Sequence, residues 1–570
     1  MSVTAPRPAR PAAAPLPPRR RATLLELLAS TDHKRIGLAT ATTAFVYFLV
    51  GGLLALTMRT ELARPGLQFL SDNTYNELFT IHGSTMFYLF AAPVVMGVGL
   101  YFVPLQIGAA RIVWPRLALA GYWLFAAAGV LMYSGFLTQQ GAASFGWTAY
   151  FPLSDSNATP GIGVDFWIIA VVLATVGVLA QAVSLLATIV RLRAPGMTML
   201  RMPLFTWSEL VTVFMVITGF PVLIVALTLL YMDRKGASIY SSTPEGAVTY
   251  QHLFWFYGHP VVYVVFFPLV GVVGEAIATF SRRRFFGFRV TVVSLLLFSA
   301  ISMSVWAHHM FATNQVSNRY FSLTSTILLV PAGLEYFGFL ATMARGRIRL
   351  ASPMLFAIGF VLLFLIGGLT GIMVAAPPLD YHVHDSYFVV AHFHYTLFGG
   401  TVFGLFAAIH YWFPKVTGRL LSERLARSSF ALLFVGALVT FLPMFWLGSE
   451  GMTRRVADYL PLHDWTFLNT LATVGAFTIF LGVCVFLANV WRSLRHGAAA
   501  GPDPWEGQTL EWATSSPPTR HNFAALPPVR SHTPLFDLRE EGRLSFGPDS
   551  GPEDNREPDA GPKDNHMEVR

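Results

Sequence analysis

Histidines occur in this sequence where an apolar chain would not be expected to carry them. The stretch "HVHDSYFVVAHFHY", residues 382–395, holds four, and the last two, His392 and His394, lie within an apolar run. Positions two apart on an α-helix point in nearly opposite directions, so one metal ion cannot take both rings. The pair therefore predicts two separate centres, and imidazole is the usual axial ligand of haem iron. A haem with two imidazole ligands needs a further ring, for which His82 is the remaining candidate.

Three more histidines could hold another metal. His308 and His309 are adjacent in "VWAHHMF", and His259 occurs in "HLFWFYGHPVVY". Neighbours on one helix can converge on an ion only near a helix edge or with some distortion, and the pair could instead make two unrelated polar contacts. Three imidazoles with an open coordination position suit copper, zinc or iron. Tyr263 follows His259 by four residues, one turn on along the same face, where a phenol could supply a proton and an electron.

The elements that position these side chains are predicted to be membrane helices. Of the 570 residues 54% are hydrophobic and only 12% are charged, whereas a soluble domain has about a quarter charged. Runs of roughly 20 apolar residues, enough to cross a bilayer, recur along the chain. We expect an all-α polytopic membrane protein with about twelve transmembrane helices, at 36–57, 78–107, 115–138, 165–190, 206–231, 251–279, 288–310, 321–344, 353–376, 388–412, 428–447 and 466–491.

Basic clusters fall in alternate connections and therefore predict the orientation. They include "PPRRR", "RLRAPGMTMLR", "SRRRFFGFR" and "ARGRIR". Because basic connections favour the cytoplasmic side, we expect a protein of a bacterial-type cell membrane with both termini in the cytoplasm. The net charge of +8 is thus a topology signal, and no nucleic-acid partner is expected.

Outside the helices we expect little folded structure. Residues 1–30 form a basic, Pro/Ala-rich cytoplasmic tail without a signal-peptide core, 31–496 form the membrane domain, and 497–570 form a polar, largely disordered cytoplasmic tail. The only cysteine, Cys484, excludes an intrachain disulfide and a cysteine-held cluster, so any metals depend on histidines and carboxylates.

Seven stretches together resemble subunit I of the haem-copper terminal oxidases of the cytochrome c oxidase type. They are "WFYGHPVVY", "VWAHHMF", "HDSYFVVAHFHY", "YFVPLQIGA", "GWTAYFPLS", "GMTRRVADY" and "DPWEGQTLEWATSSPP". The resemblance runs from "STDHKRIG" to "LEWATSSPP". It implies a respiratory enzyme that reduces O2 to water with electrons from cytochrome c, coupled to proton uptake.

The resemblance also implies roles for the histidines. His82 and His394 would ligate a low-spin haem of the haem A type, and His392 a high-spin haem of the same type. The ligands of the copper that faces this second haem, CuB, would be His259, His308 and His309. Tyr263 would be joined covalently to His259.

Other matched positions would surround the haems. Arg454 and Arg455 match the arginine pair that binds haem propionates, a role that suits the paired donors of guanidinium. Arg59 matches an arginine near the low-spin haem formyl group, and Trp147 a tryptophan near the propionates.

Partner subunits are implied as well. His384 and Asp385 match the ligands of a magnesium at the boundary with subunit II. The sequence has no copper-pair site of its own, so subunit II would carry the copper site at which electrons enter. Subunit III is a further expected partner.

The sequence departs from the family at the usual proton carriers. An aspartate normally follows the second helix, where Arg111 stands. The glutamate of "GHPEVY" is replaced by Val261, and "VPTGIK" becomes "VPAGLE", with Glu335 in place of the lysine.

Two interpretations follow: protons move by another route, or oxygen is reduced without efficient pumping. We favour one pathway through Glu335, because a carboxyl in the membrane is costly enough to suggest a role. Glu275 could be where protons enter, and Glu209 is a similar candidate. Either could equally be a carboxylate at a wet helix end.

Three other functions share some of these sequence features. A nitric oxide reductase has a related helical core but lacks the copper and the tyrosine, and "GHPVVY" with Tyr263 argues against it. A quinol oxidase is harder to exclude, although "SDNTYNELFT" lacks the His and Gln associated with quinol binding. A transporter without cofactors would also have many helices and scattered histidines.

Overall fold

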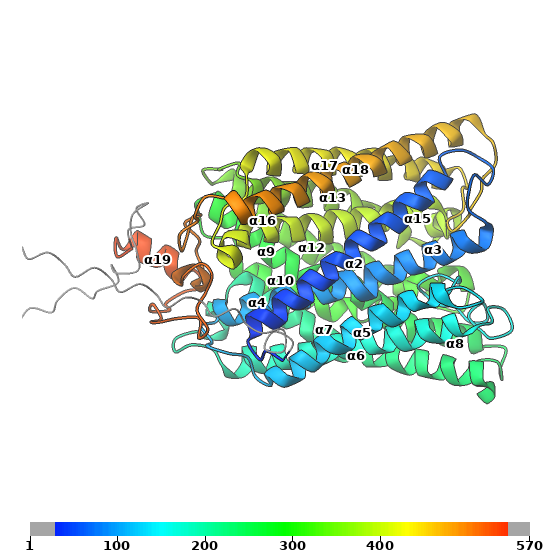
Figure 1. Cartoon of the computed structure of the whole chain (residues 1–570), viewed down its shortest axis with the longest axis horizontal. Helices are drawn as coiled ribbons and strands as arrows, with labels where there is room; N and C mark the ends of the chain where they lie inside the picture. The colour runs from blue at the N-terminus through cyan, green and yellow to red at the C-terminus, as the bar shows by residue number, and fades with distance from the viewer. Residues whose placement is uncertain (1–28, 545–570) are drawn as a thin grey trace, which may run out of the picture.

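The computed structural model of the protein describes residues 29–544. Over this range the regular structure is helical, with isolated β-bridges and no strand. Twelve helical spans are long and apolar enough to cross a membrane, as predicted. They run side by side along the long axis of the molecule (Figure 1). The spans are α2 (His33–Glu61); α3 (Asp72–Ser84), η1 (Thr85–Ala91) and α4 (Ala92–Gln106); α5 (Pro115–Ser134) with η2 (Gly135–Leu137); α6 (Ile162–Arg191); α7 (Leu204–Met232) with η4 (Asp233–Ala237); α8 (Gly246–Val264) and α9 (Phe267–Phe280); α10 (Phe288–Ser302) with η5 (Trp306–Thr313); α11 (Asn318–Ile327) and α12 (Leu329–Ala344); α13 (Ser352–Val374); α15 (Tyr387–Thr396), η6 (Leu397–Val402) and α16 (Phe403–Thr417); α17 (Glu423–Ser449); and α18 (His463–His496). Shorter helices are η3 (Met199–Arg201), α14 (Pro377–Val383), η7 (Leu510–Ala513) and α19 (Pro534–Glu540).

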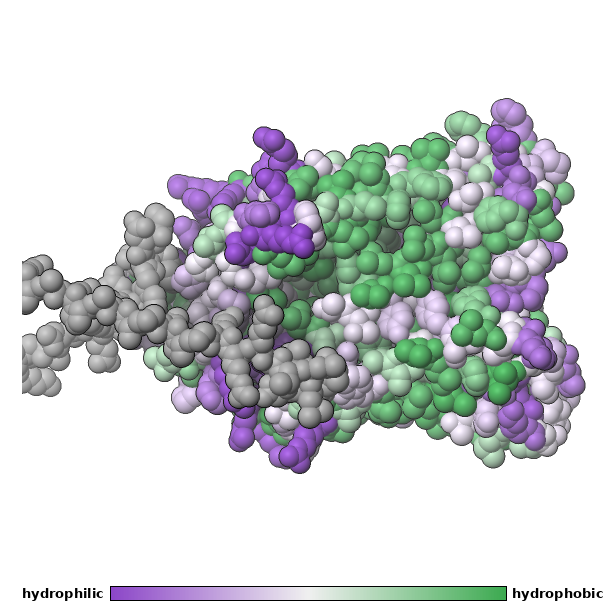
Figure 2. Space-filling view, in the orientation of Figure 1, coloured by the Kyte–Doolittle hydropathy of each residue, from purple (hydrophilic) through white to green (hydrophobic). Residues whose placement is uncertain are grey.

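An apolar band covers the middle of the bundle on the face shown in Figure 2. Figure 2 shows hydrophobic residues over the central part of the visible face and hydrophilic residues at both ends. On the membrane-spanning helices, large apolar side chains such as Val130, Phe337 and Trp446 are more than half exposed. Because exposed apolar surface of this extent is disfavoured in water, the band marks the part of a multi-pass protein that faces lipid.

The basic connections and the C-terminal segment lie at one end of the bundle. The start of α2 is found at the same end as α19 (Figure 1). Arg284, in the connection after α9, pairs with Asp537 of α19 at 2.8 Å, and Arg201 donates to the carbonyl of Val529. Two of the basic clusters that the positive-inside rule groups together, at 191–201 and 281–289, therefore both contact the C-terminal segment.

Helix ends differ from the predicted spans where capping decides them. The second span was predicted from residue 78, but α3 begins at Asp72, because the hydroxyl of Ser71 accepts a hydrogen bond from the backbone N–H of Thr74. Hydropathy locates only the apolar part of such a helix.

One predicted helix was wrong in a way that matters for the site. The prediction placed His308 and His309 on a continuous helix over 288–310, whereas α10 ends at Ser302 and both histidines lie on the 3₁₀ segment η5. A 3₁₀ helix has three residues per turn, so its side chains are spaced differently from those of an α-helix. The distortion that an adjacent pair needs in order to converge is supplied by this segment.

Wider turns follow two of the other histidines. The π-helical segments η1 and η6 begin three residues after His82 and His394, respectively. Such segments inside α-helices often occur at functional sites.

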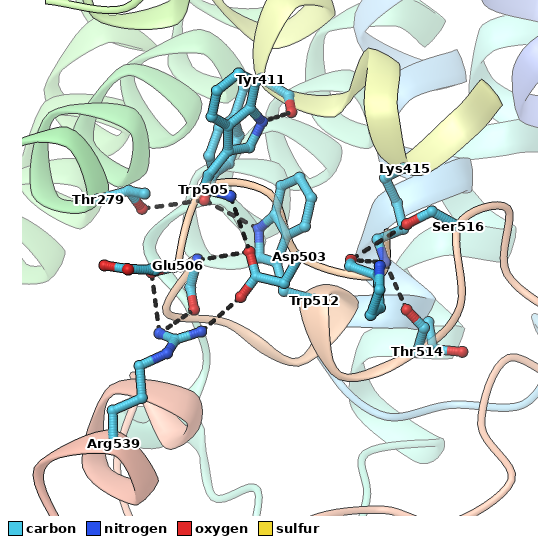
Figure 3. Close-up of polar contacts among 12 residues, drawn as sticks. Thr279, Tyr411, Lys415, Asp503, Trp505, Glu506, Trp512, Thr514, Ser516 and Arg539 are labelled. Carbon is cyan, nitrogen blue, oxygen red and sulfur yellow. Dashed lines mark hydrogen bonds and ion pairs between the residues drawn. The ribbon is translucent and has the colours of Figure 1, made fainter. Parts of the chain in front are cut away.

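The predicted disorder from residue 497 onward is wrong for residues 497–544. Asp503 pairs with Arg539 at 2.5 Å, and the ammonium group of Lys415, from α16, donates to the carbonyls of Pro502 and Thr514 at 2.8 and 2.6 Å (Figure 3). Trp512 is completely buried. This segment is too polar to form a hydrophobic core of its own. It instead docks on the helix ends and buries its apolar side chains against the core of the bundle. The parts of the two predicted tails at 1–28 and 545–570 lie outside the described residues.

Candidate active site

The three histidines of the predicted copper site converge. The Nε2 atom of His309 lies 3.2 Å from Nδ1 of His259 and 3.1 Å from Nε2 of His308. One ligand atom from each ring lies within 4.8 Å of the others, and among residues 29–544 this is the one group of three or more metal-binding side chains with that geometry. Helix α8 supplies the first ring and η5 the other two.

Neighbouring side chains hold the rings in position. Nδ1 of His308 is 2.7 Å from the hydroxyl of Ser325 on α11, which leaves Nε2 directed into the cluster. The ring of Trp255 stacks on His309, with 3.8 Å between centroids and 15° between planes. A second contact that fixes the ligand nitrogen is typical of metal-binding histidines. The donor set and its second contacts therefore fit a copper ion.

Tyr263 lies beside the same cluster. Its ring centroid is 4.6 Å from that of His259, as the spacing of four residues predicts. The Nδ1 atom of His259 faces the other histidines, while its Nε2 is buried and has no hydrogen-bond partner. An unpaired buried nitrogen is costly, so this atom needs a partner that the polypeptide does not supply by hydrogen bonding.

His392 and His394 point to opposite sides of α15. Nδ1 of His392 is 3.0 Å from the carbonyl oxygen of Gly367 and 3.2 Å from the hydroxyl of Thr370, both on α13. The ring of His394 instead stacks on Phe441 of α17, with centroids 4.5 Å apart. The two rings thus contact different helices, as expected of side chains on opposite faces of α15.

His82 and His394 are presented in the same way. Nδ1 of His82 is 2.8 Å from the carbonyl oxygen of Gly51 on α2, and Nδ1 of His394 is 2.8 Å from that of Val390. A carbonyl can only accept, so Nδ1 carries the proton and Nε2 offers its lone pair. Both rings are half-buried, which leaves surface beside them for a ligand. This chemistry fits axial ligation of a haem iron.

Arg59 has unused donors in the interior. Its Nη2 donates to the backbone and side-chain oxygens of Asn469, on α18, at 2.9 and 3.0 Å. Its Nε and Nη1 are buried and have no hydrogen-bond partner. Two unpaired donors on a buried guanidinium fit an acceptor such as a haem formyl group. No sequence pattern predicts that Asn469 holds this arginine, since the two residues are 410 positions apart.

Arg454, Arg455 and Trp147 were predicted to lie near the haem propionates. Arg454 pairs with Asp385 and keeps a buried, unpaired Nε. Burial, with the positive charge of Arg454 beside it, lowers the pKa of Arg455 to about 10, so the guanidinium is still charged at neutral pH. Trp147 stacks on Phe87, with centroids 4.2 Å apart. A pair of adjacent cations with an unused donor fits anionic groups such as haem propionates.

His384 and Asp385 lie next to these arginines. His384 Nδ1 is 3.3 Å from a carboxylate oxygen of Asp380, and the hydrogen bond between them raises the pKa of His384. Its Nε2 is 4.0 Å from Asp385. Burial acts to raise the pKa of Asp385, but the charges of Arg454, His384 and Arg455 outweigh it and the pKa is lowered. Asp380 was not predicted, although its position four residues before His384 could have indicated it.

The three residues that replace the usual proton carriers of the family differ in burial. Val261 is completely buried and Arg111 is exposed. Glu335 is buried on α12, with the hydroxyl of Ser294 3.5 Å away. Glu275 on α9 instead accepts hydrogen bonds from the amide of Gln106 and the backbone N–H of Phe205, so the structure does not bring these two carboxyls together.

Comparison with known proteins identifies the family of the chain. The family described as "Cytochrome C and Quinol oxidase polypeptide I" matches residues 35–478. A "Probable cytochrome c oxidase subunit 1-beta" from Nocardia farcinica is 50% identical over 538 residues, which cover 93% of this chain and 92% of the relative. A cytochrome c oxidase subunit 1 from Corynebacterium diphtheriae is 49% identical over 548 residues, which cover 94% and 97%. A cryo-EM structure of a haem-copper terminal oxidase dimer shares the fold, with a TM-score of 0.72 over 89% of both chains at 17% identity.

The fold and the site define a membrane oxidoreductase built for haem and copper. The chain belongs to the family of subunit I of the haem-copper oxidases. The relatives confirm both the predicted family and the predicted enzyme class, cytochrome c oxidase.

Proposed function

We propose that this chain is the catalytic subunit of a respiratory oxidase that reduces O2 to water with electrons from cytochrome c. The observation that carries the proposal is the convergence of His259, His308 and His309 beside Tyr263. The relatives are named cytochrome c oxidases, which supports cytochrome c as the donor here. Because the family includes quinol oxidases, quinol is the alternative donor.

The histidines would hold the metal groups as follows. His82 and His394 would hold a low-spin haem and His392 a high-spin haem, both of the haem A type, with CuB at the three-histidine cluster. When bound, these groups would provide the site at which O2 is reduced and the electrons that reduce it. Tyr263 would add a proton and an electron from its phenol, and the unpaired Nε2 of His259 supports a covalent bond between the two side chains.

The surrounding side chains would hold the haem substituents. Arg59 would donate its two free N–H groups to the formyl oxygen of the low-spin haem, and Arg454 and Arg455 would neutralise propionates, with Trp147 packed beside them. His384 and Asp385 would bind magnesium at the boundary with subunit II.

Protons would reach Tyr263 along a line of polar groups that includes Glu335. Ser294 and Thr291 on α10 are buried and face α12: the Ser294 hydroxyl donates to the carbonyl of Pro331, and a Cβ on Gly338 would lie 3.3 Å from the Thr291 hydroxyl. One turn beyond Ser294, the ring of Phe298 packs on Tyr263, with 5.0 Å between centroids. The line therefore leads from the cytoplasmic end of α12 toward the phenol.

The assembly would lie in a bacterial-type cell membrane with both termini in the cytoplasm. Subunit II, with the copper site at which electrons enter, would complete the enzyme, and subunit III is a further expected partner. The end of the bundle that gathers the basic connections supports this orientation.

Oxygen uptake by the purified oxidase tests the proposed function. The oxidase should consume O2 with reduced cytochrome c and lose this activity in His308→Leu, while the exposed His463→Leu serves as the control. Uptake with quinol but not with cytochrome c would establish the alternative, and a preparation without haem would contradict both.

External pH in proteoliposomes tests the coupling. A pulse of reduced cytochrome c, with potassium and valinomycin, should acidify the medium if protons are pumped despite Arg111, Val261 and Glu335. Alkalinisation alone would show that oxygen is reduced without pumping.

A further inference from the structure

Glu209 is a carboxyl side chain without a partner in the interior of the bundle. It lies on α7 and is completely buried. In the described part of the chain neither of its oxygen atoms has a hydrogen-bond partner. Its carboxyl group lies against α4 beside Gly99, where a Cβ would be 2.6 Å from Oε1.

Such a position is costly to maintain. Burying an unpaired polar group costs free energy, and burying an unpaired charge costs far more. A methionine or leucine would fill the same space without this cost. A carboxyl retained here therefore indicates a use for its proton.

Two further buried carboxyls form a pair at the end of the bundle that the C-terminal segment covers. The amide group of Gln106, at the end of α4, donates to Glu275 at 2.7 Å and to Glu511 at 3.2 Å. Glu511 belongs to η7, in the segment that docks on the helix ends, and it is completely buried. Two carboxyls that share one amide donor form a group able to hold and pass a proton.

The helix geometry connects this pair to Glu209. Glu275 accepts from the backbone N–H of Phe205 at 2.9 Å, and the Thr206 hydroxyl donates to the amide oxygen of Gln106 at 2.9 Å. Glu209 follows these α7 residues by four and three positions and so lies about one turn, roughly 5 Å, deeper along the helix. On α4, Gly99 lies seven residues before Gln106, about two turns or roughly 10 Å, so the Glu209 carboxyl that packs on Gly99 lies deeper in the bundle than the carboxyl pair.

We propose that Glu209 is a proton carrier of a second uptake route, which enters through Glu511 and Glu275 and is separate from Glu335. The inference rests on the proposed function, because it is the oxidase reaction that would consume or move the proton. In each transfer one proton leaves the Glu209 carboxyl toward the reaction site and one returns from Glu275, with no change in oxidation state. Rotation of the Glu209 side chain together with a short chain of waters would span the one to two helical turns between the two groups.

The decisive variants remove the exchangeable proton without removing the side chain. Glu209→Gln keeps the shape, and Glu209→Met fills the same space with no polar atom. Ser208→Ala is the matched control, because the Ser208 hydroxyl is also buried without a partner on the same helix but holds no carboxyl proton. Each variant is purified as the whole oxidase and its haem spectrum is recorded first.

We expect both Glu209 variants to lower proton uptake or pumping in proteoliposomes by roughly tenfold or more, with Ser208→Ala at the wild-type level. We also expect the redox-induced infrared difference spectrum of the wild type to contain the carbonyl stretch of a protonated carboxyl. That band should shift in D2O and be absent from Glu209→Gln.

Two results would overturn the inference. The first is a Glu209 variant that assembles with a normal haem spectrum and matches the wild type in proton uptake and pumping. The second is an unchanged infrared band in Glu209→Gln. If Glu209→Gln does not assemble, Glu209→Met decides, since an apolar side chain suits this apolar site. Failure of the wild type to consume O2 with cytochrome c would instead contradict the proposed function, and the infrared result would be unaffected by it.

Discussion

His392 and His394 lie two residues apart on α15 but face different helices. The first is held by Gly367 on α13, and the second stacks on Phe441 of α17. Because one short helix carries both rings, the two haems that they would hold must lie on either side of it. This arrangement would allow electrons to pass from one centre to the other across a single helix.

Loss of the His82 ring should remove one haem only. In His82→Ala we expect the low-spin haem signal to disappear while copper remains bound, because the copper ligands lie on α8 and η5. Optical spectra and metal analysis measure the two quantities. The exposed His463→Ala is the control, and loss of copper together with the haem would contradict separate centres.

Ser325 should influence copper affinity without being a copper ligand. Its hydroxyl is 2.7 Å from Nδ1 of His308, so Ser325→Ala frees that ring to rotate. We expect copper affinity to fall by about 10- to 100-fold, the usual effect of losing such a contact. Copper retention during dialysis against a chelator measures this. Thr326→Ala, whose hydroxyl bonds only to the backbone carbonyl of Ser322, should retain copper like the wild type.

Asn469 should tune the low-spin haem through Arg59. In Asn469→Leu the guanidinium loses the side-chain acceptor Oδ1, keeps the backbone carbonyl, and should move relative to the haem formyl group. We expect a shift in the low-spin haem absorption maximum and midpoint potential, with the haem content unchanged. Thr470→Ala, on the exposed side of the same helix, is the control. An unaltered spectrum in Asn469→Leu would refute the assigned role of Arg59.

Docking of residues 497–544 should weaken as pH rises. Burial raises the pKa of Asp503 and of Glu511. A carboxyl whose pKa is raised by folding contributes full stability below its unfolded pKa, about 4, and loses it as pH rises through the folded pKa. Hydrogen exchange of this segment should therefore speed up over that range, by at most about tenfold per pH unit for each group.

Glu511→Gln should flatten this dependence because it removes one of the two titrating groups. The exposed Glu540→Gln serves as its control. An exchange rate that slows as pH rises, once the intrinsic chemical rate is corrected for, would have the wrong sign for this explanation.

Glu335→Gln should slow the delivery of protons to Tyr263. We expect turnover with cytochrome c to fall by roughly tenfold or more, because the amide cannot carry a proton. Oxygen uptake measures turnover, and haem spectra check assembly. The exposed Glu245→Gln is the control on the opposite end of the bundle. Full activity in Glu335→Gln would show that protons reach Tyr263 by a route that does not include Glu335.

The sequence by itself determined the features that depend on local periodicity. Twelve apolar runs predicted twelve spans, the spacing of two put His392 and His394 on opposite faces, and the spacing of four put Tyr263 beside His259. These predictions succeed because a helix repeats every 3.6 residues whatever packs against it. The motif resemblance identified the family for the same reason, since each motif is a local string.

The tertiary structure decided what depends on contacts between distant segments. The convergence of His308 and His309 on His259 required the 3₁₀ segment η5, which no helical pattern predicted. Asn469 reaches Arg59, and residues 497–544 dock on the helix ends, only because the bundle brings them together. The isolation of Glu209 is likewise a property of its neighbours on α4 and α7, because a side chain lacks a partner only with respect to everything packed around it.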